Sequence, residues 1–212
     1  MSNAKRLYSL MLIAVAVFVA YALYKNFVHD PQAAEFLGHK SNLKRALNVS
    51  MWLNVMYVHV AFACVAMLSG AVNFPSSIRT KYSRFHRING YVYAISVLIV
   101  VLTSGYMAPY ATGGKAAGMA FNLLNLLWPA MTLAAIVQIR KKRIAKHRKW
   151  MIRSYAFCFT NLSIHLLTTL ATAGFGLAYA TGYTIGVYGS IVMLLAAAEL
   201  VVRAGTRRPT PS

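Results

Sequence analysis

Acidic side chains are almost absent from this sequence of 212 residues. Three Asp and Glu stand against 22 Lys and Arg, so the net charge is +19. Charged residues make up 12% of the chain, whereas soluble domains carry roughly 25%. Two of the three acids, Asp30 and Glu35, fall in one polar connection. Acid–base catalysis by paired carboxylates therefore has almost no residues to draw on.

Cysteines and the common catalytic signatures are also scarce. The two cysteines, Cys64 and Cys158, lie inside apolar runs, and no CxxC or CxxCH sequence occurs. This removes any sequence support for a zinc ribbon or for covalently attached haem. The sequences GxSxG, HExxH, GxGxxG and the Walker motif are absent as well. The sequence therefore gives no signature of a hydrolase of the soluble type, while a redox enzyme stays open.

Long apolar runs are what the sequence has instead. Hydrophobic residues make up 58% of the chain, and the mean hydropathy is +0.54. Six apolar segments each have about the ~20 residues that an α-helix needs to cross the hydrocarbon of a bilayer. The alternating strands of a membrane β-barrel do not occur. The sequence predicts an all-α membrane protein, a six-transmembrane-helix bundle, with helices over Leu7–Tyr24, Met51–Phe74, Tyr91–Ala111, Met119–Ile139, Met151–Gly174 and Ile185–Val202.

The connections suggest how the chain is organised. We expect a first transmembrane helix with an outer loop, then a five-helix membrane core, then a disordered basic tail, at residues 1–50, 51–202 and 203–212. Within the outer loop, Asp30 followed by Pro31 is typical of a helix start, and Gly38 is typical of a helix end. A short helix is therefore predicted between them.

The first apolar segment also has a feature of a signal peptide. Ala20-Tyr21-Ala22 has the A-x-A form of a signal-peptidase site, and Lys5 and Arg6 precede the segment. The run is long for a signal peptide, so an uncleaved helix is favoured. Cleavage stays open.

The basic residues are distributed unevenly over the two sides of the predicted bundle. The N-terminus, the tail and the connections Pro75–Gly90 and Arg140–Arg153 together hold 17 Lys and Arg, and the alternate connections hold 5. This asymmetry places both termini in the cytoplasm, which suggests a bacterial inner-membrane protein. Basic residues between apolar runs indicate membrane lipids, and not nucleic acid, as partners.

Two helical hairpins look alike. The second and third apolar segments are joined by a stretch that ends in YSRFHRINGYVYA, and the fourth and fifth by one that ends in RIAKHRKWMIRSYA. His86-Arg87 and His147-Arg148 are 61 residues apart and each enters the next helix. The pattern predicts a possible parallel repeat of a helical hairpin.

His59 and His165 lie inside apolar segments, where a buried ionisable group is a functional candidate. Each is about 12–14 Å from the outer end of its helix at 1.5 Å per residue. Two imidazoles at one depth suit the two axial faces of a b-type haem iron. Asn161 and Thr168 lie on the same helix face as His165 and are expected as hydrogen-bond partners. Two alternatives stay open, which are structural histidines and a proton or substrate relay.

A second candidate site involves basic residues near the cytoplasmic helix ends. His147 and His165 are 18 residues apart, so a continuous α-helix would place them on one face, about 27 Å apart. This spacing permits a second bis-histidine iron near the other surface. A pair of His and Arg beside helix N-terminal amides also suits an anionic headgroup, and a solvated basic loop is the third interpretation. The residues concerned are His86, Arg87, His147, Arg148 and Arg153.

Two further positions carry structural expectations. Glu199 is the only acid inside an apolar segment and is expected to pair with Arg203, four residues later. Trp128-Pro129 is expected to kink the fourth helix and to free a backbone carbonyl.

These motifs give a resemblance to a known family. The stretch from Met51 to Ala171 resembles the bacterial membrane-protein family called domain of unknown function 2306. That resemblance implies a multi-helix membrane protein and gives no established activity. The matching residues are His59; His86, Arg87, Gly90 and Tyr93; Trp128; and His147, Arg148, Trp150, Met151, Arg153, Ser154 and Tyr155.

A looser likeness concerns the ascorbate-reducible di-haem cytochromes b. They also have six helices, with four haem-ligating histidines in two layers. The fourth apolar segment here contains no histidine, so this likeness is architectural only.

The leading functional hypothesis is therefore a haem b electron carrier with a histidine-built site and a quinone or another redox partner. The alternative is a transporter or a protein that binds anionic lipid through its His-Arg motifs. A third interpretation is an assembly or structural factor without a ligand.

The charge asymmetry makes a prediction about topology. Reporter fusions after Arg87 and Arg148 should report cytoplasm, because these positions belong to the side that holds 17 of the basic residues. Fusions after Lys115 should report the opposite side. The reverse pattern at both basic connections would contradict the assignment.

Overall fold

The structure is a computed structural model that describes residues 3–40 and 46–206. Every regular element among these residues is helical, and no strand occurs among them. Six helical spans are long and apolar enough to cross a membrane, as the sequence predicts. They are Arg6–His29, Val49–Val72, Ser83–Tyr110, Gly114–Arg140, Ile144–Gly174 and Tyr179–Gly205.

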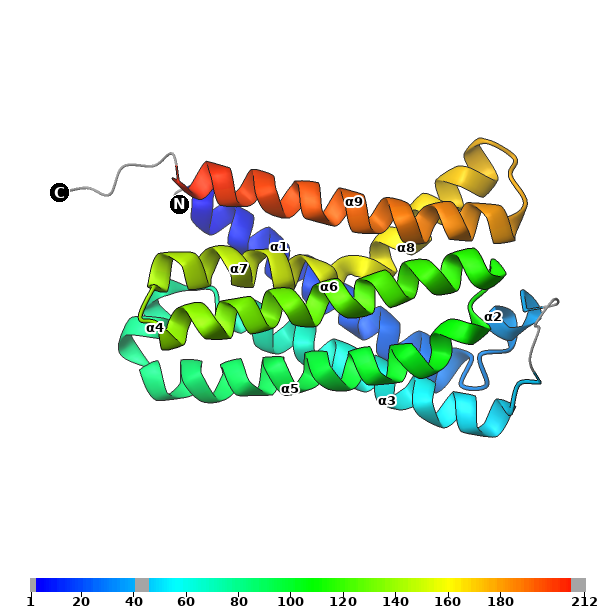
Figure 1. Cartoon of the computed structure of the whole chain (residues 1–212), viewed down its shortest axis with the longest axis horizontal. Coiled ribbons are helices and arrows are strands. Elements are labelled where there is room, and N and C mark those ends of the chain that lie inside the picture. Colours follow the sequence, from blue (N-terminus) through cyan, green and yellow to red (C-terminus); the bar gives the residue numbers. More distant parts are fainter. Residues whose placement is uncertain (1–2, 41–45, 207–212) are drawn as a thin grey trace. The chain divides into compact units, whose positions relative to one another are not determined.

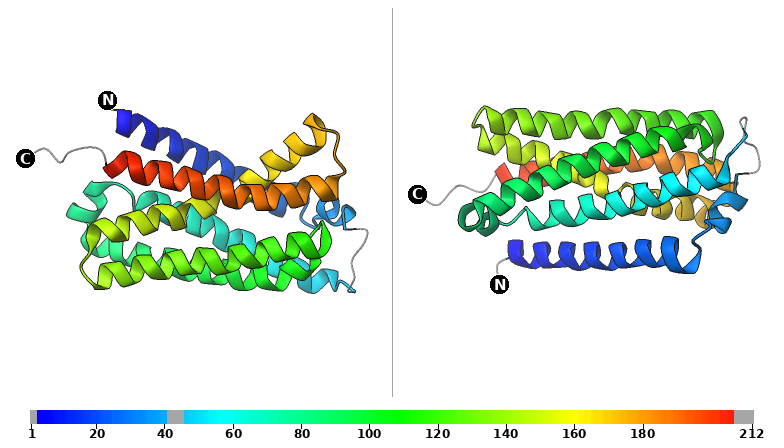
Figure 2. Two further views of the ribbon diagram at one scale, coloured as in Figure 1. Left: turned by 45° about the horizontal axis from the view of Figure 1, so that its top comes forward. Right: turned by 90° about the horizontal axis from the view of Figure 1, so that it is seen from below.

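The chain divides into two compact units, with the change at Met107. In the first unit, α3 and α5 pack along each other as a hairpin, and α1 packs on α3 (Figures 1 and 2). The elements of this unit are α1 (Asn3–Tyr24), η1 (Lys25–His29), α2 (Ala34–Gly38), α3 (Val49–Val72), α4 (Ser76–Lys81) and α5 (Ser83–Met107).

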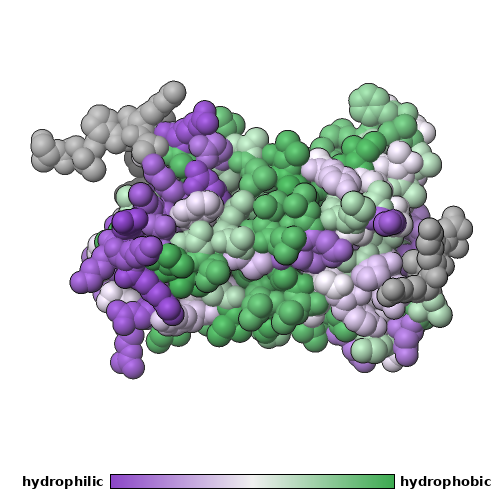
Figure 3. All heavy atoms as spheres, viewed as in Figure 1, coloured by the Kyte–Doolittle hydropathy of each residue, from purple (hydrophilic) through white to green (hydrophobic). Residues whose placement is uncertain are grey.

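The second unit is built from two packed pairs of helices. Its α6 packs against α7, and its α8 packs against α9. The elements are η2 (Ala108–Tyr110), α6 (Gly114–Arg140), α7 (Ile144–Ala156), η3 (Phe157–Phe159), α8 (Thr160–Thr169), η4 (Leu170–Gly174) and α9 (Tyr179–Thr206). Hydrophobic residues cover the middle of these helices, and hydrophilic residues gather where α6 and α7 meet (Figure 3).

The short helix of the outer connection forms, but it begins later than the sequence suggests. Asp30 accepts hydrogen bonds from the backbone N–H groups of Ala34 (2.9 Å) and Glu35 (3.1 Å). It therefore caps the first turn of α2, although it precedes that helix by four residues. The bond from Ala34 is the main reason that the pKa of Asp30 lies below its usual value. Pro31 lies in the preceding turn, and Gly38 is the last residue of α2, as predicted.

The His-Arg motifs lie within helices. α5 begins at Ser83 and α7 at Ile144, several residues before the apolar segments that the sequence marks. The hydropathy pattern detects only the part of a helix that matches the hydrocarbon, while backbone hydrogen bonding continues into the polar zone.

The fifth span is not one continuous α-helix, and here the sequence interpretation is wrong. The 3-10 turn η3 interrupts it between α7 and α8, and the π-helical η4 ends it. Figure 1 shows the chain changing direction between α7 and α8. A 3-10 turn advances about 120° per residue instead of about 100°. His147 and His165 therefore do not share a helix face as an unbroken helix would require.

The basic tail also differs in part from its prediction. Residues 203–206 continue α9 as regular helix, so disorder is wrong for them. Residues 207–212 lie outside the described part of the chain.

Small residues let α8 and α9 approach closely. A Cβ atom placed on Gly186 would lie 2.6 Å from Oγ1 of Thr168 and 3.0 Å from the carbonyl oxygen of Ile164. A Cβ on Gly182, one turn earlier, would lie 2.9 Å from Cγ2 of Thr172. Van der Waals contact between backbones is a main source of helix association in lipid, and glycine makes it possible.

This packing predicts that alanine destabilises the protein at Gly186 but not at Gly105. Gly186→Ala should lower the free energy of unfolding by about 1–3 kcal/mol, because the added methyl group forces α8 and α9 apart. Gly105→Ala is the matched control, since a Cβ there meets nothing within 4 Å. Unfolding in mixed detergent micelles measures both values. Equal stability of the two variants would contradict the packing account.

Candidate functional site

His59 is held in a defined orientation inside the first unit. Its Nδ1 lies 3.0 Å from the hydroxyl oxygen of Thr103 on α5. That hydroxyl donates its own proton to the backbone carbonyl of Ile99 or Val100, at 2.8 and 2.9 Å. When the hydroxyl donates to one of these carbonyls, Thr103 accepts a hydrogen bond from His59. That arrangement requires the tautomer with the proton on Nδ1 and the lone pair on Nε2.

Two asparagines tie α3 to the beginning of α5 at the other end of this unit. Asn89 donates to the carbonyl of Ser69 (2.7 Å) and to Oδ1 of Asn73 (3.0 Å). Asn73 donates to the carbonyl of His86 (3.1 Å). This network fixes the backbone that carries His86 and Arg87. His86 is half-buried, and Arg87 is exposed.

His147 in the second unit has the same kind of support. Its Nδ1 lies 2.9 Å from the carbonyl oxygen of Ala135 on α6. A carbonyl can only accept, so Nδ1 is the protonated nitrogen and Nε2 keeps its lone pair. One turn away from Ala135, Thr132 bonds Ser154 of α7 at 2.7 Å and the carbonyl of Trp128 at 3.0 Å. These contacts hold α7 at a fixed register on α6.

Arg153 is engaged by an acid that the sequence assigns to another partner. Its Nη2 lies 2.8 Å from Oε2 of Glu199, and its guanidinium stacks 5.0 Å from the ring centroid of Trp150. The expected pair of Glu199 with Arg203 also forms, at 3.1 Å. Arg153 is less exposed than Arg203, at 24% against 71% of the side chain. Glu199 thus joins α7 to α9, which the spacing of four residues alone does not reveal.

His165 and its two expected partners are placed differently from one another. His165 and Asn161 are exposed on α8, whereas Thr168 is buried against Gly186. The hydroxyl of Thr168 has no hydrogen-bond partner within the described residues. Thr168 therefore does not orient the ring of His165.

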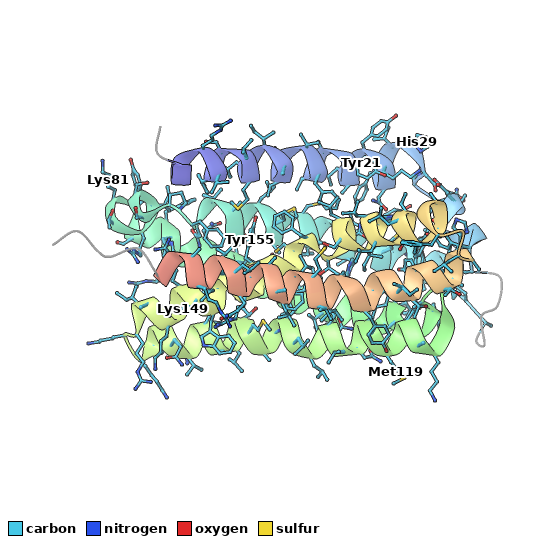
Figure 4. The ribbon with its side chains drawn as sticks, turned by 90° about the horizontal axis from the view of Figure 1, so that it is seen from above. Tyr21, His29, Lys81, Met119, Lys149 and Tyr155 are labelled. Atoms are coloured by element: carbon cyan, nitrogen blue, oxygen red, sulfur yellow. The ribbon has the colours of Figure 1, made fainter. Side chains whose placement is uncertain are left out.

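The arrangement provides separate candidate sites, one around His59 and one around His147. In each, a main-chain or hydroxyl oxygen holds Nδ1 and leaves Nε2 to act as an acceptor or metal ligand. Lys149, labelled in Figure 4, lies in the basic N-terminal half of α7. Among the described residues, no group of three or more His, Cys, Asp or Glu could hold a bare metal ion. A haem iron needs only two protein ligands, so this finding does not bear on haem.

Comparison with known proteins identifies one family. A family model described as "Predicted membrane protein (DUF2306)" matches residues 56–202. This range contains all the candidate residues discussed above. No curated protein and no solved structure matches the chain.

The acid that joins α7 to α9 leads to a stability prediction. Glu199→Gln should lower the free energy of unfolding, because it removes the charge that pairs with both Arg153 and Arg203. Arg203→Gln removes only the more exposed ion pair and should change stability by less than about 1 kcal/mol. Detergent unfolding of the two variants checks the order. A larger loss for Arg203→Gln would contradict it.

Proposed function

The chain belongs to the DUF2306 family of membrane proteins, and we propose that it binds b-type haem and carries electrons within the membrane, with His59 as an axial ligand of the iron. The observation that carries the proposal is the hydrogen bond between His59 and Thr103. The proposal also places the protein in a bacterial inner membrane with both termini in the cytoplasm, on the charge asymmetry alone.

The chemistry of this pair fits iron ligation. Histidines that bind metals nearly always donate their other ring N–H to an oxygen, which fixes the tautomer and raises the basicity of the ligating nitrogen. Thr103 serves this purpose for His59 when its own hydroxyl donates to an α5 carbonyl, because it then accepts the proton of Nδ1. The surroundings are membrane-embedded, so an imidazole lone pair without a partner would be unfavourable by several kcal/mol. Bound haem would satisfy Nε2 and supply one-electron chemistry at its iron.

His147 is the second histidine whose Nδ1 is bonded to an oxygen while Nε2 can bind a metal. Its Nδ1–H is held by the Ala135 carbonyl, so its Nε2 is equally suited to iron. The sequence pairs His59 with His165 and His147 with His86 as two bis-histidine sites. Each pair takes one residue from each unit of the structure. The second axial histidine of each iron is therefore proposed from the sequence alone, and the spectroscopic experiment below tests it.

The chain's own residues would do three things for such a site. Thr103 and the Ala135 carbonyl would fix the orientation of the ligand rings. The Asn73–Asn89 network would hold the backbone of His86 in place. The apolar residues around the spans would limit the access of water to the iron and thereby influence its redox potential.

The alternative function is binding of anionic lipid headgroups, and one observation favours it. Arg87 and Arg148 are exposed and are the fifth residues of α5 and α7, directly after the first turns, whose N-terminal amides also attract anions. Arg153 is a weaker candidate for this role because Glu199 already neutralises it. The alternative gains support if the haem experiment fails.

The haem proposal predicts a coloured protein. Purified in mild detergent after expression with adequate haem supply, the protein should show a Soret band and, on reduction, the sharp visible bands of six-coordinate b-type haem. His59→Ala should abolish or convert this spectrum. Thr103→Val keeps the shape of the side chain but removes the acceptor for Nδ1, and it should weaken haem retention by about 10–100-fold.

One control variant and one further test variant make the result specific. His29→Ala changes an imidazole outside the candidate sites and should leave the spectrum unaltered. His165→Ala tests the second ligand and should give a five-coordinate spectrum if the pairing is right. A well-folded protein that stays colourless with adequate haem supply would overturn the proposal.

A further inference from the structure

Positive charge is concentrated where α6 passes into α7. Residues 140–146 read RKKRIAK, and we call this segment the cationic tip. All of its basic side chains are exposed, and hydrophilic residues gather at this end of the two helices (Figure 3). The basic residues of the tip are Arg140, Lys141, Lys142, Arg143 and Lys146.

The chain has no acid left to neutralise the cationic tip. The full sequence contains three Asp and Glu. Glu199 is shared by two arginines outside the tip, Glu35 pairs with Lys25 at 2.6 Å, and Asp30 caps α2. Among residues 3–40 and 46–206, no ion pair involves the tip. Its counter-charge must therefore come from another molecule.

The backbone of the cationic tip is held in one conformation. The N–H group of Lys142 donates to the carbonyl of Ile139 and that of Arg143 to the carbonyl of Gln138, both at 2.9 Å. Lys142 adopts a left-handed conformation with φ of 58°, which closes the turn. A rigid surface loses little conformational entropy when a partner binds. This favours a partner of fixed shape over mobile lipid headgroups.

The cationic tip also extends beyond the headgroup layer. Arg153 and Glu199 form an ion pair, and charged groups are excluded from hydrocarbon, so this pair marks the edge of the hydrocarbon. The headgroup layer adds about 5–8 Å beyond that edge. Arg148 precedes Arg153 by five residues, about 7 Å along α7, and so lies among the headgroups. Ile144 precedes Arg153 by nine residues, about 13 Å, so the tip lies in water.

An apolar side chain lies among these charges. Ile144, the first residue of α7, is 51% exposed between Arg143 and Lys146. Headgroup phosphates offer such a side chain no favourable contact, whereas protein interfaces combine an apolar centre with a charged rim. An acidic protein surface with an apolar centre therefore fits the cationic tip better than a lipid headgroup does.

We propose that the cationic tip docks the acidic face of a soluble electron-transfer protein. Opposite charges attract and orient this partner, and Ile144 contacts the apolar centre of its acidic face. His147 directly follows the tip, so the docked protein would approach the part of α7 that carries a candidate iron ligand. The redox role of the partner rests on the proposed function, whereas docking can be measured without haem.

The test uses the full-length protein in phosphatidylcholine nanodiscs, with a flavodoxin, an acidic soluble one-electron carrier, as the probe. Biolayer interferometry should show saturable binding at about 50 mM salt that weakens at about 300 mM, because salt screens exposed charges. Lys141→Gln/Lys142→Gln/Lys146→Gln should raise the apparent Kd by about tenfold, the combined effect of three exposed ion pairs. Ile144→Ala should raise it by about threefold, the effect of losing one partly buried apolar contact.

Arg79→Gln/Lys81→Gln/Arg84→Gln is the matched control, because it removes the same charge from exposed positions of α4 and α5. It should leave the apparent Kd nearly unchanged. All six substituted side chains are exposed, so both triple variants should elute as folded proteins in size-exclusion chromatography. If the tip variant does not, the Ile144→Ala titration decides. Equal weakening by both triple variants, or binding that does not saturate, overturns the docking surface.

Anionic lipid is the competing occupant, and lysine acetylation distinguishes it. Lys141, Lys142 and Lys146 should react with sulfo-N-hydroxysuccinimide acetate equally fast in phosphatidylcholine discs and in discs with about 30% phosphatidylglycerol, because they lie beyond the headgroups. Lys149, four residues before Arg153, is the reference that anionic headgroups should protect. Mass spectrometry measures the four rates. Protection of the three tip lysines would assign the tip to the bilayer and overturn the proposal.

The haem result and the docking result can be separated. Saturable flavodoxin binding by a colourless protein would retain the docking surface and reject the haem proposal. A haem-containing protein without saturable flavodoxin binding would reject the docking surface alone.

Discussion

The need to satisfy polar groups in hydrocarbon is the constraint on which the rest of this structure depends. Backbone groups meet it by forming helices, which is why six apolar segments become six helical spans. Side chains have fewer options, and each polar residue in a span must find a partner or a ligand. The hydrogen bond between His59 and Thr103 engages Nδ1 of that imidazole, and the haem proposal assigns Nε2 to the iron.

The same constraint explains the charged residues near the basic ends of the helices. Glu199 lies between two arginines, so α9 carries a carboxylate with two counter-ions on one side of the bilayer. Within residues 3–40 and 46–206, the exposed basic residues around α7 form no ion pair of this kind, and they are suited to anionic surfaces such as that of a membrane. Arg153 is paired with Glu199 and serves to hold α7 on α9, whereas Arg148 is exposed and can meet lipid headgroups. A count of basic residues in the sequence does not distinguish these two roles.

The sequence predicts the elements of this fold better than the contacts between them. Hydropathy is enough to find the spans, and the spacing of four residues is enough to pair Glu199 with Arg203. The bonds from His59 to Thr103 and from Arg153 to Glu199 join residues 44 and 46 positions apart. Such pairs depend on helix register, which no local pattern encodes. The sequence also does not predict the 3-10 turn η3, because no proline or glycine occurs in Phe157–Phe159.

The central proposal is that Nε2 of His59 and Nε2 of His147 are positioned to bind a haem iron. Electron paramagnetic resonance of the oxidised, purified protein at cryogenic temperature tests it most directly, because the signal reports the spin state and axial ligands of ferric haem. The account predicts a low-spin signal with two imidazole ligands that is lost or converted to high spin in His59→Ala. A haem-free spectrum, or a haem signal that His59→Ala leaves unchanged, would contradict it.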